Sequence, residues 1–459
     1  MIGRVPAGVA RRLPWRQAEN ASTELASPEL GRLAAPSTAV GEQTLGSATF
    51  RALRNRNYRL FYIGQSISLS GTWMQTIAQA WLVLDLTNSK VALGTVTMLQ
   101  FLPITIFVLF AGVIADRVPK RNFILVTQSL AMSQALVLAA LVWSGHIQLW
   151  HVYVLALVLG LANAFEQPTR QAFVVEMVGR DDLMNAVALN SGMFNGARLI
   201  GPAVGGFVIA LVGVKGAFLL NGISFIPVIA GLLMMRLSEL YVPAQKRMTA
   251  NPVLELREGL HYAFRTPSVL LIVILVAIIG TFGYNFTVVL PLVDRYVLHQ
   301  GSVAFGFLTA AVGLGALISA LMLASRKSAT KFTLFAGGTM FGMLLCAVAL
   351  STWLPLTLLF LLLLGIANTA FAATANTSLQ LATPDHLRGR VMALYMLLFA
   401  GSTPIGGYLT GVLADRLGTQ TAIGIEGALC LVGVAAGLLY YVSHREGVQA
   451  TADIARAGA

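Results

Sequence analysis

The chain has 459 residues, of which 56% are hydrophobic and 11% charged, and its mean hydropathy is +0.75. So few charged residues cannot cover a water-facing surface, which excludes a soluble protein and predicts a polytopic membrane protein. The net charge of +12 does not indicate nucleic acid binding, because the bases recur between apolar segments instead of forming one patch with aromatics. Cys346 and Cys430 both lie in apolar segments, so neither a disulfide framework nor a metal site is implied.

The first 49 residues are rich in Ala, Pro, Ser, Gly and Arg and contain no apolar run long enough for a signal-peptide core. We expect 1–49 to be a disordered cytoplasmic tail, with a partner-binding arm as the alternative. From Phe50 to Leu60 bases alternate with apolar residues. This pattern predicts a segment lying along the inner membrane surface, near anionic lipid.

Twelve apolar segments follow, each long enough to cross a bilayer as a helix. The fold class predicted is an all-α integral membrane protein. A polar stretch at 237–267 is expected to be a cytoplasmic linker between two six-helix bundles, at 50–236 and 268–442, with a second cytoplasmic tail at 443–459. Within the linker, Glu255 to Phe264 has an amphipathic pattern. The expected spans are 59–84, 91–114, 122–143, 149–175, 187–212, 216–236, 268–293, 303–324, 332–350, 353–380, 391–413 and 420–442.

The loops between spans are unequal in charge. The side that carries few bases has Lys90, Lys215, Arg295 and Arg416. The other side is rich in bases, which by the positive-inside rule places both termini in the cytoplasm and the protein in the cell membrane. The residues on this basic side are Arg51, Arg54, Arg56, Arg59, Arg117, Lys120, Arg121, Lys246, Arg247, Arg257, Arg265, Arg326, Lys327, Lys331, Arg388 and Arg390.

The hairpin between the second and third spans interrupts apolar sequence with an acid followed by three bases. It resembles the hairpin G-x-L-A-D-R-x-G-R-R/K-x-x-L of the major facilitator superfamily, although Pro119 replaces the second glycine. The resemblance implies a twelve-span transporter fold. The matching residues are Gly112, Ile114, Asp116, Arg117, Lys120, Arg121 and Ile124.

This hairpin is predicted to be a cytoplasmic gate. The start of span 11 carries Arg388 and Arg390 beside the positive end of the helix dipole, so an acid is favoured there. We expect Asp116 to dock on that helix start and to favour an outward-open state. The alternative is that Asp116 pairs with Arg117 or Arg121 within its own hairpin.

Spans 4 and 5 carry charges inside the membrane. A charge at mid-bilayer costs about 2.5 to 3.5 kcal/mol on insertion scales, so such groups face a cavity or a partner. Glu166 and Arg170 are four residues apart around Pro168, and Arg198 lies near the middle of span 5. Two readings stay open: a permanent ion pair of Glu166 with Arg170 or Arg198, or proton coupling through Glu166 in a poorly hydrated cavity. Solvated rim positions are expected for Asp85, Asp294 and Glu426.

Span 5 also carries closely spaced glycines. Gly192 and Gly196, and then Gly201 and Gly205, are four residues apart and share a helix face that lets another backbone approach, whereas Pro202 bends the helix. We expect Gly201 and Gly205 to pack closely on a neighbouring span, one from the other half. A plain packing seam is the alternative to a functional motif. The string through Gly206 looks like G-x-x-x-G-P-x-x-G-G, which in this superfamily is associated with proton-coupled exporters.

The run from Gln167 to Gly206 is similar to the branch of the superfamily that includes macrolide efflux pumps and the enterobactin exporter. The likeness covers about residues 50 to 440. Span 4 has no base in its outer half, and Asp85-Leu-Thr87 lies only at the outer end of span 1. The proton sites of other drug-antiporter branches therefore cannot be carried over.

The two halves repeat each other at an offset of 205 residues. Gly160-Leu-Ala-Asn163 recurs as Gly365-Ile-Ala-Asn368, and the match continues over three spans. Parallel repeats about an axis normal to the membrane create a central cavity that opens to alternate sides. The further matches are Gly201 with Gly406, Gly206 with Gly411, Gly213 with Gly418 and Gly222 with Gly427.

The function predicted is a proton-coupled secondary exporter of a small amphipathic molecule such as a drug or siderophore. No hydrolase, zinc-protease or phosphate-loop motif is present, so no enzyme and no cofactor is expected. The alternatives are an importer or facilitator of the same fold, or a transporter-like sensor. The partners expected are substrate, protons and lipid, around a monomer. The residues expected to face the cavity are Trp73, Gln75, Gln79, Trp81, Gln100, Phe282, Tyr284 and Asn285.

Overall fold

The computed structural model describes residues 50–241, 252–324 and 330–444, which are helical and contain no strand. The chain divides into a unit at Met1–Thr49 and a unit at Phe50–Ala459, and the second is described here. Ten helical segments in the described ranges are long and apolar enough to cross a membrane. The all-α membrane class predicted from the sequence is confirmed. The two predicted tails lie outside the described residues, apart from 443 and 444.

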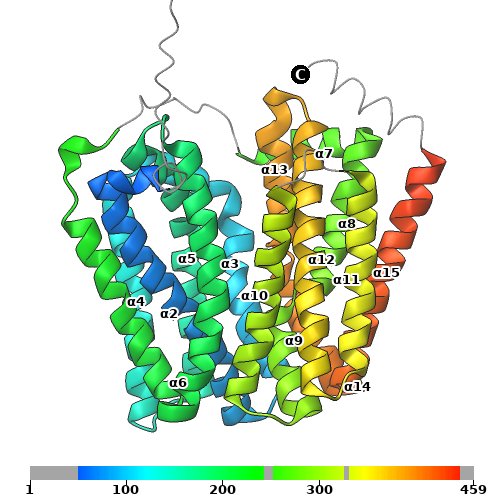
Figure 1. Ribbon diagram of the computed structural model, residues 1–459, viewed down its shortest axis with the longest axis horizontal. Helices are drawn as coiled ribbons and strands as arrows, with labels where there is room; N and C mark the ends of the chain where they lie inside the picture. Colours follow the sequence, from blue (N-terminus) through cyan, green and yellow to red (C-terminus); the bar gives the residue numbers. More distant parts are fainter. Residues whose placement is uncertain (1–49, 242–251, 325–329, 445–459) are drawn as a thin grey trace, which may run out of the picture. The chain divides into compact units, whose positions relative to one another are not determined.

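The first group of helices ends before the linker. Asn55 accepts a hydrogen bond from Tyr58 N at the start of α2, and Ser89 accepts one from Ala92 N at the start of α3, so both helices begin at side-chain caps. These helices lie alongside one another (Figure 1). The elements are η3 (Arg51–Arg54), α2 (Arg56–Thr87), α3 (Lys90–Arg117), α4 (Lys120–Trp143), α5 (Leu149–Val178) and α6 (Leu183–Leu233).

The 51 residues of α6 comprise two helices joined at Gly213, whose backbone has φ 74° and ψ 177°. A residue with a side chain is strained at this positive φ, so glycine makes the turn possible. Predicted spans 5 and 6 meet at this residue. Pro202 and Pro227 lie within the two parts without ending either helix.

The second group follows a short connecting segment. It begins with α7, which covers the amphipathic stretch predicted in the linker, and its helices again lie alongside one another (Figure 1). After η4 (Leu237–Glu239) in the connecting segment, the elements are α7 (Pro252–Arg265), α8 (Pro267–Gly283), α9 (Phe286–Val293), the π-helix η5 (Asp294–Leu298), α10 (Ser302–Ala324), α11 (Lys331–Leu350), α12 (Leu354–Leu381), α13 (Asp385–Phe399), α14 (Thr403–Leu417) and α15 (Thr419–Ser443).

Spans 7 and 11 were expected to be continuous, and the structure corrects both. The first is broken at Tyr284 and Asn285, between α8 and α9, and the second at residues 400–402, between α13 and α14. Gly401 at the second break has weak helix preference, and Pro404 at the second position of α14 has no backbone N–H with which to continue a preceding helix. The corresponding spans of the first group, α2 and the first part of α6, are unbroken up to Thr87 and Gly213.

Apolar side chains form two buried clusters. The larger draws on both groups and includes Val83 and Leu138 together with Leu290 and Phe371. The smaller lies in the first group, where Phe61 packs edge-on against Phe173. We name the end of the helices that carries the start of α2, α7 and the end of α15 the terminal end, and the opposite end the distal end (Figure 1).

The two groups meet through two matching backbone contacts. A Cβ atom at Gly206 on α6 would lie 2.6 Å from the carbonyl oxygen of Ser302 on α10. A Cβ at Gly411 on α14 would lie 2.6 Å from the carbonyl oxygen of Lys90 on α3. Gly206 and Gly411 are the pair related by the 205-residue offset, so the sequence repeat corresponds to a repeated contact.

The other glycines of span 5 contact different neighbours from those expected. A Cβ at Gly201 would lie 2.6 Å from the Ser70 carbonyl oxygen, and one at Gly205 would lie 3.1 Å from Met74 Cγ, both on α2 of the same group. A Cβ at Gly196 would meet nothing within 4 Å. The expectation that Gly201 and Gly205 face the other half is therefore wrong, because the four-residue spacing identifies a helix face but not the helix that covers it.

Alanine at Gly206 or Gly411 should lower the thermal midpoint of the detergent-purified protein. The added methyl group would have to push a facing carbonyl away, and overpacking of this kind costs about 1 to 3 kcal/mol. Gly192→Ala is the matched control, because a Cβ there meets nothing within 4 Å and alanine favours helix by up to about 1 kcal/mol. Stabilisation of all three variants would contradict the contacts between the groups.

Candidate functional site

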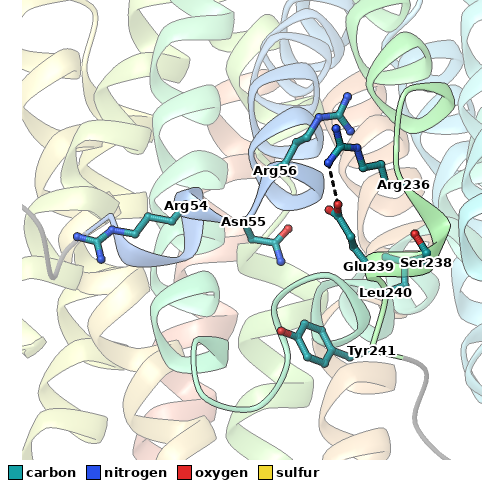
Figure 2. A pocket seen from close by; sticks show the side chains of 8 residues that line it. All are labelled: Arg54, Asn55, Arg56, Arg236, Ser238, Glu239, Leu240 and Tyr241. Carbon is teal, nitrogen blue, oxygen red and sulfur yellow. Dashed lines mark hydrogen bonds and ion pairs between the residues drawn. The ribbon is translucent and has the colours of Figure 1, made fainter.

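One pocket opens at the terminal end, beside the start of α2 and the segment after α6 (Figure 2). Its volume is about 630 Å³, and Arg236 binds Glu239 at its edge at 3.0 Å. Arg56 donates to the Met234 carbonyl at 2.9 Å. The Arg56 bond holds the start of α2 to the end of α6 at the surface. The lining residues are Arg54, Asn55, Arg56, Arg236, Ser238, Glu239, Leu240 and Tyr241.

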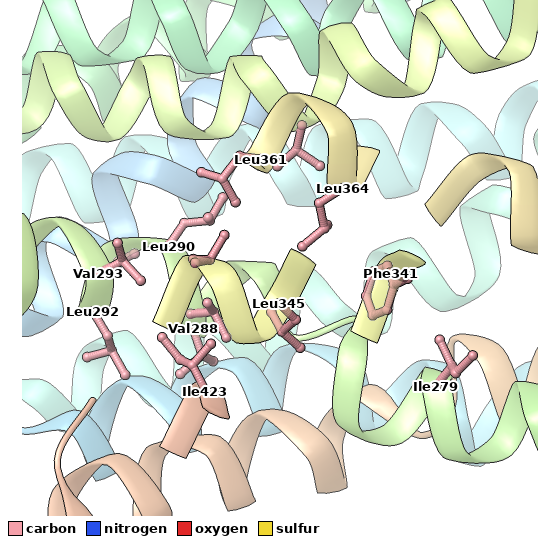
Figure 3. Close-up of a cluster of buried hydrophobic side chains, with 14 of the residues drawn as sticks. Ile279, Val288, Leu290, Leu292, Val293, Phe341, Leu345, Leu361, Leu364 and Ile423 are labelled. Atoms are coloured by element: carbon pink, nitrogen blue, oxygen red, sulfur yellow. The ribbon is translucent and has the colours of Figure 1, made fainter. Parts of the chain in front are cut away.

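The two helix breaks of the second group lie side by side, about midway between the ends of their helices. A Cβ at Gly280 on α8 would lie 2.7 Å from the Leu398 carbonyl oxygen on α13, and one at Gly406 on α14 would collide with the Thr281 carbonyl and the Asn285 amide. Apolar side chains around α9 pack beside the first break (Figure 3). Because carbonyl and amide groups lose helical partners at a break, this is the part of the interior where polar backbone can face a ligand.

Arg198 of the first group lies next to these breaks. It is midway between Leu183 and Gly213, and a Cβ at Gly313 on α10 would lie 3.1 Å from its carbonyl oxygen. Its guanidinium is 5.8 Å from the centroid of the Trp73 ring and interacts electrostatically with Tyr284. The Arg198 side chain therefore lies against Trp73 of α2 in its own group and within electrostatic range of Tyr284 at the α8–α9 break of the other.

Aromatic rings surround Tyr284 in the second group. The Tyr284 ring contacts Phe399 edge-on, with centroids 4.3 Å apart, and stacks on Phe341 at 6.0 Å. In the first group, Phe194 meets Trp73 edge-on at 5.9 Å. Each group of helices thus supplies aromatic rings to the surroundings of Arg198, with Trp73 in contact with its guanidinium.

Buried amides join the helices of the first group. Gln75 donates to Gln134 at 2.9 Å and accepts from Asn221 at 2.6 Å, while Gln79 donates to Gln100 at 3.0 Å. The exposed fractions of Gln75 and Gln79 are 2% and 4%, and that of Asn285 is 0%. These three residues were expected to face a cavity; the structure corrects this, because they are buried between packed helices, where Gln75 and Gln79 bind other amides and Asn285 donates to the Thr281 carbonyl.

Glu166 has two partners in the first group. Gln128 donates to its Oε1 at 3.2 Å, and Arg170 Nε lies 3.6 Å from the same atom. The exposed fraction of each charged side chain is 14%, and α5 continues through Pro168 without ending. The structure thus contains the Glu166–Arg170 pair that was one of the two readings, and it does not pair Glu166 with Arg198.

Two acids expected at solvated rims are buried. Glu426 on α15 is 1% exposed and accepts a hydrogen bond from the Thr410 hydroxyl. Asp294 in η5 is 0% exposed, and among the described residues neither of its side-chain oxygens has a hydrogen-bond partner. The 205-residue offset could have predicted the burial of Glu426, because it pairs this residue with Asn221, another buried polar group.

The hairpin expected to form a gate binds mainly within its own group. Lys120 pairs with Glu176 at 2.8 Å, and Arg121 donates to the Leu232 carbonyl at 2.7 Å, at the end of α6. Arg117 is exposed, whereas the surroundings of Gly112 and the side chain of Asp116 are not among the parts that the structure describes. Arg390, expected to attract Asp116, pairs with Glu258 of α7. Docking of Asp116 on span 11 therefore stays a prediction.

Polar contacts at the distal end join the two groups, and we name them the distal lock. Sequence reasoning missed them, because they link residues more than 200 positions apart. Lys90 is shared by two contacts, which makes it the central residue of the lock. The contacts are Asp85 with Arg295 at 2.8 Å, the Tyr296 hydroxyl with Asn88, and Lys90 Nζ with the Ala414 carbonyl at 2.9 Å and over the Tyr296 ring at 4.7 Å.

The family model of the transmembrane secretion effectors matches residues 47–455. The multidrug efflux pump Tap of Mycolicibacterium fortuitum is 26% identical over 379 residues, covering 81% of this chain and 92% of that protein. The staphyloferrin A transporter of Staphylococcus aureus is 25% identical over 394 residues, covering 84% and 96%. The solved structure of the POT family transporter PepTSo has the same fold, with a TM-score of 0.67 at 12% identity over 85% of this chain and 99% of that one.

Methionine at Lys90 should weaken the distal lock. The change removes the ammonium that binds Ala414 and Tyr296 and keeps the apolar stem. Losing a surface contact of about 1 kcal/mol would raise the population of a distally open state about fivefold. Spin labels at positions 86 and 417, in a background without Cys346 and Cys430, would report this as a longer distance.

The matched control for this measurement is Lys215→Met, because the Lys215 ammonium lies over the Trp143 ring of its own group at 5.2 Å. An unchanged distance distribution in the Lys90 variant would show that the lock does not hold the distal end closed.

Proposed function

Because the chain belongs to the transmembrane secretion effector family, whose members are transporters of the major facilitator type, we propose that it is a secondary exporter of a small amphipathic molecule. The superfamily resemblance stated from the hairpin and span 5 is confirmed by this match. We infer the direction of transport from two relatives that this chain matches over nearly their full length. One is an efflux pump and the other is a siderophore transporter. Export also agrees with the span 5 motif.

We count twelve membrane crossings in the proposed transporter. The ten apolar segments include α6, which turns at Gly213 and supplies two crossings. The less apolar α2, with 32 residues, is long enough to supply the twelfth. The terminal end would face the cytoplasm, since the basic loops lie there, and the protein would act as a monomer in the cell membrane.

Alternating access is the mechanism we propose for this architecture. At the glycine contacts of α6 with α10 and of α3 with α14, no side chain separates the facing backbones. The two bundles can therefore rotate against each other at these contacts. In the state described, the distal lock joins the bundles on the side that would face outward. Substrate would enter from the cytoplasm, reach Arg198 and Tyr284 at mid-depth, and leave when the lock opens.

Proton coupling is assigned to Glu166 in this proposal. The carboxylate is held by Gln128 and Arg170 and is still 14% exposed, so a proton from a hydrated path can reach it. Protonation would cancel the ion pair with Arg170 and free both side chains to move. An ion pair that forms and breaks in this way gives the two states that a coupled cycle needs.

Transport by the full-length protein in inside-out vesicles tests the function. With an imposed proton gradient, we expect accumulation of at least one member of a panel of neutral, anionic and cationic amphipathic dyes, and loss of that accumulation with a protonophore. Accumulation that ignores the gradient would contradict coupling. Transport only in the opposite direction would make the protein an importer.

Glutamine at Glu166 should abolish gradient-driven accumulation and leave dye binding within about twofold, since the amide keeps the hydrogen bond with Gln128 but cannot ionise. The Glu426→Gln variant is compared with it, because Glu426 is a second buried acid, at 1% exposed. Loss of proton dependence in Glu426→Gln together with its retention in Glu166→Gln would contradict the assignment and place coupling on α15.

A further inference from the structure

Arg198 is a charged group at mid-depth for which the described residues provide no counter-charge. It forms no ion pair with any described acid, whereas Arg170, Arg295 and Arg390 each have one. Two other acids inside the spans have partners of their own, Glu166 in Arg170 and Glu426 in Thr410. The positive charge of Arg198 is therefore not neutralised by this part of the protein.

The aromatic neighbours of Arg198 offset only part of the cost of its position. A charge at mid-bilayer costs about 2.5 to 3.5 kcal/mol on insertion scales. The contact with Trp73, at 5.8 Å from the ring centroid, is worth about 0.5 to 2 kcal/mol. A bound anion would remove the remaining cost, because a guanidinium presents paired N–H donors that fit a carboxylate.

The surroundings of Arg198 indicate what else such a ligand would carry. Trp73 and Phe194 come from the first group, and in the second group Tyr284 packs with Phe399 beside the α8–α9 break. These rings belong to different groups of helices, so a molecule bound here would touch both. A flat apolar body fits between ring faces, whereas a strongly hydrated small ion gains nothing from them.

We propose that Arg198 binds the anionic group of the transported molecule, and that the substrate is an amphipathic anion with a planar or aromatic body. This inference rests on the proposed transport function and adds the charge class of the substrate. Arg198 neutralises a carboxylate at mid-depth, while Trp73 and Tyr284 hold the apolar body. Since the ligand contacts both groups of helices, its binding is linked to the arrangement of the two groups.

The test uses two probes that differ only in charge, dansylglycine and its neutral amide, titrated by fluorescence into purified full-length protein without a gradient. We expect the wild type to bind the carboxylate about ten- to a hundredfold more tightly than the amide, as for a charge-assisted hydrogen bond. Arg198→Gln should remove this preference and leave affinity for the amide unchanged. Arg198→Lys, which keeps the charge without the planar donor pair, should retain part of it.

Lys215→Gln is the matched control, since it removes one cation that also lies over a tryptophan, Trp143, within the same group. It should keep the full preference. Equal affinity of the wild type for the two probes, failure of the wild type to bind dansylglycine, or an unchanged preference in Arg198→Gln would each overturn the proposal. The wild-type comparison needs no variant, so it decides the matter even where Arg198→Gln does not fold.

The binding measurement tests the anion site and the vesicle experiment tests the exporter, so one proposal can be contradicted while the other is supported. A preference for the anion that depends on Arg198, without any gradient-driven transport, would support the anion site and contradict the exporter. Gradient-driven transport of neutral or cationic dyes, with no preference for dansylglycine in binding, would support the exporter and contradict the anion site.

Discussion

The closest approach between the two groups of helices is made by backbone alone. A Cβ at Gly206 or at Gly411 would lie 2.6 Å from a carbonyl oxygen on the facing helix. Because no side chain fits there, the two contacts fix where the groups can meet and in which register. Arg198 lies on the same helix as Gly206, two turns before it, so the glycine contact also determines that this arginine reaches the second group at mid-depth.

The two helix breaks of the second group require a position in the protein interior. In a membrane, backbone polar groups that leave a helix need partners within the protein or a water-filled cavity. The breaks at Tyr284–Asn285 and at residues 400–402 lie against each other, and Asn285 donates to the Thr281 carbonyl at 2.8 Å. The second group thus supplies irregular backbone, whereas the first supplies the arginine and an unbroken helix, and both supply aromatic rings.

Charged side chains have different kinds of partner at different depths in the molecule. At the terminal end, Lys120 pairs with Glu176 and Arg121 binds the last carbonyls of α6, which fixes the hairpin to its own group. At the distal end, Asp85 and Lys90 reach the other group. Between these levels Glu166 has a basic partner and Arg198 has no acidic one among the described residues. Polar contacts and ion pairs therefore stabilise the two ends of the molecule, whereas at mid-depth the Arg198 guanidinium is left without an acidic partner among the described residues.

The sequence by itself determined the membrane class, the superfamily and the repeat, because hydropathy, glycine spacing and loop charge depend on residues close together in the chain. It also identified Arg198 and Glu166 as intramembrane charges. Only the tertiary structure decided their partners: Gly201 and Gly205 against α2, Gly206 against α10, Gln75 with Gln134, and the burial of Glu426. Such pairings join residues tens to hundreds of positions apart, and a periodic pattern shows which face of a helix is special without showing which helix covers it.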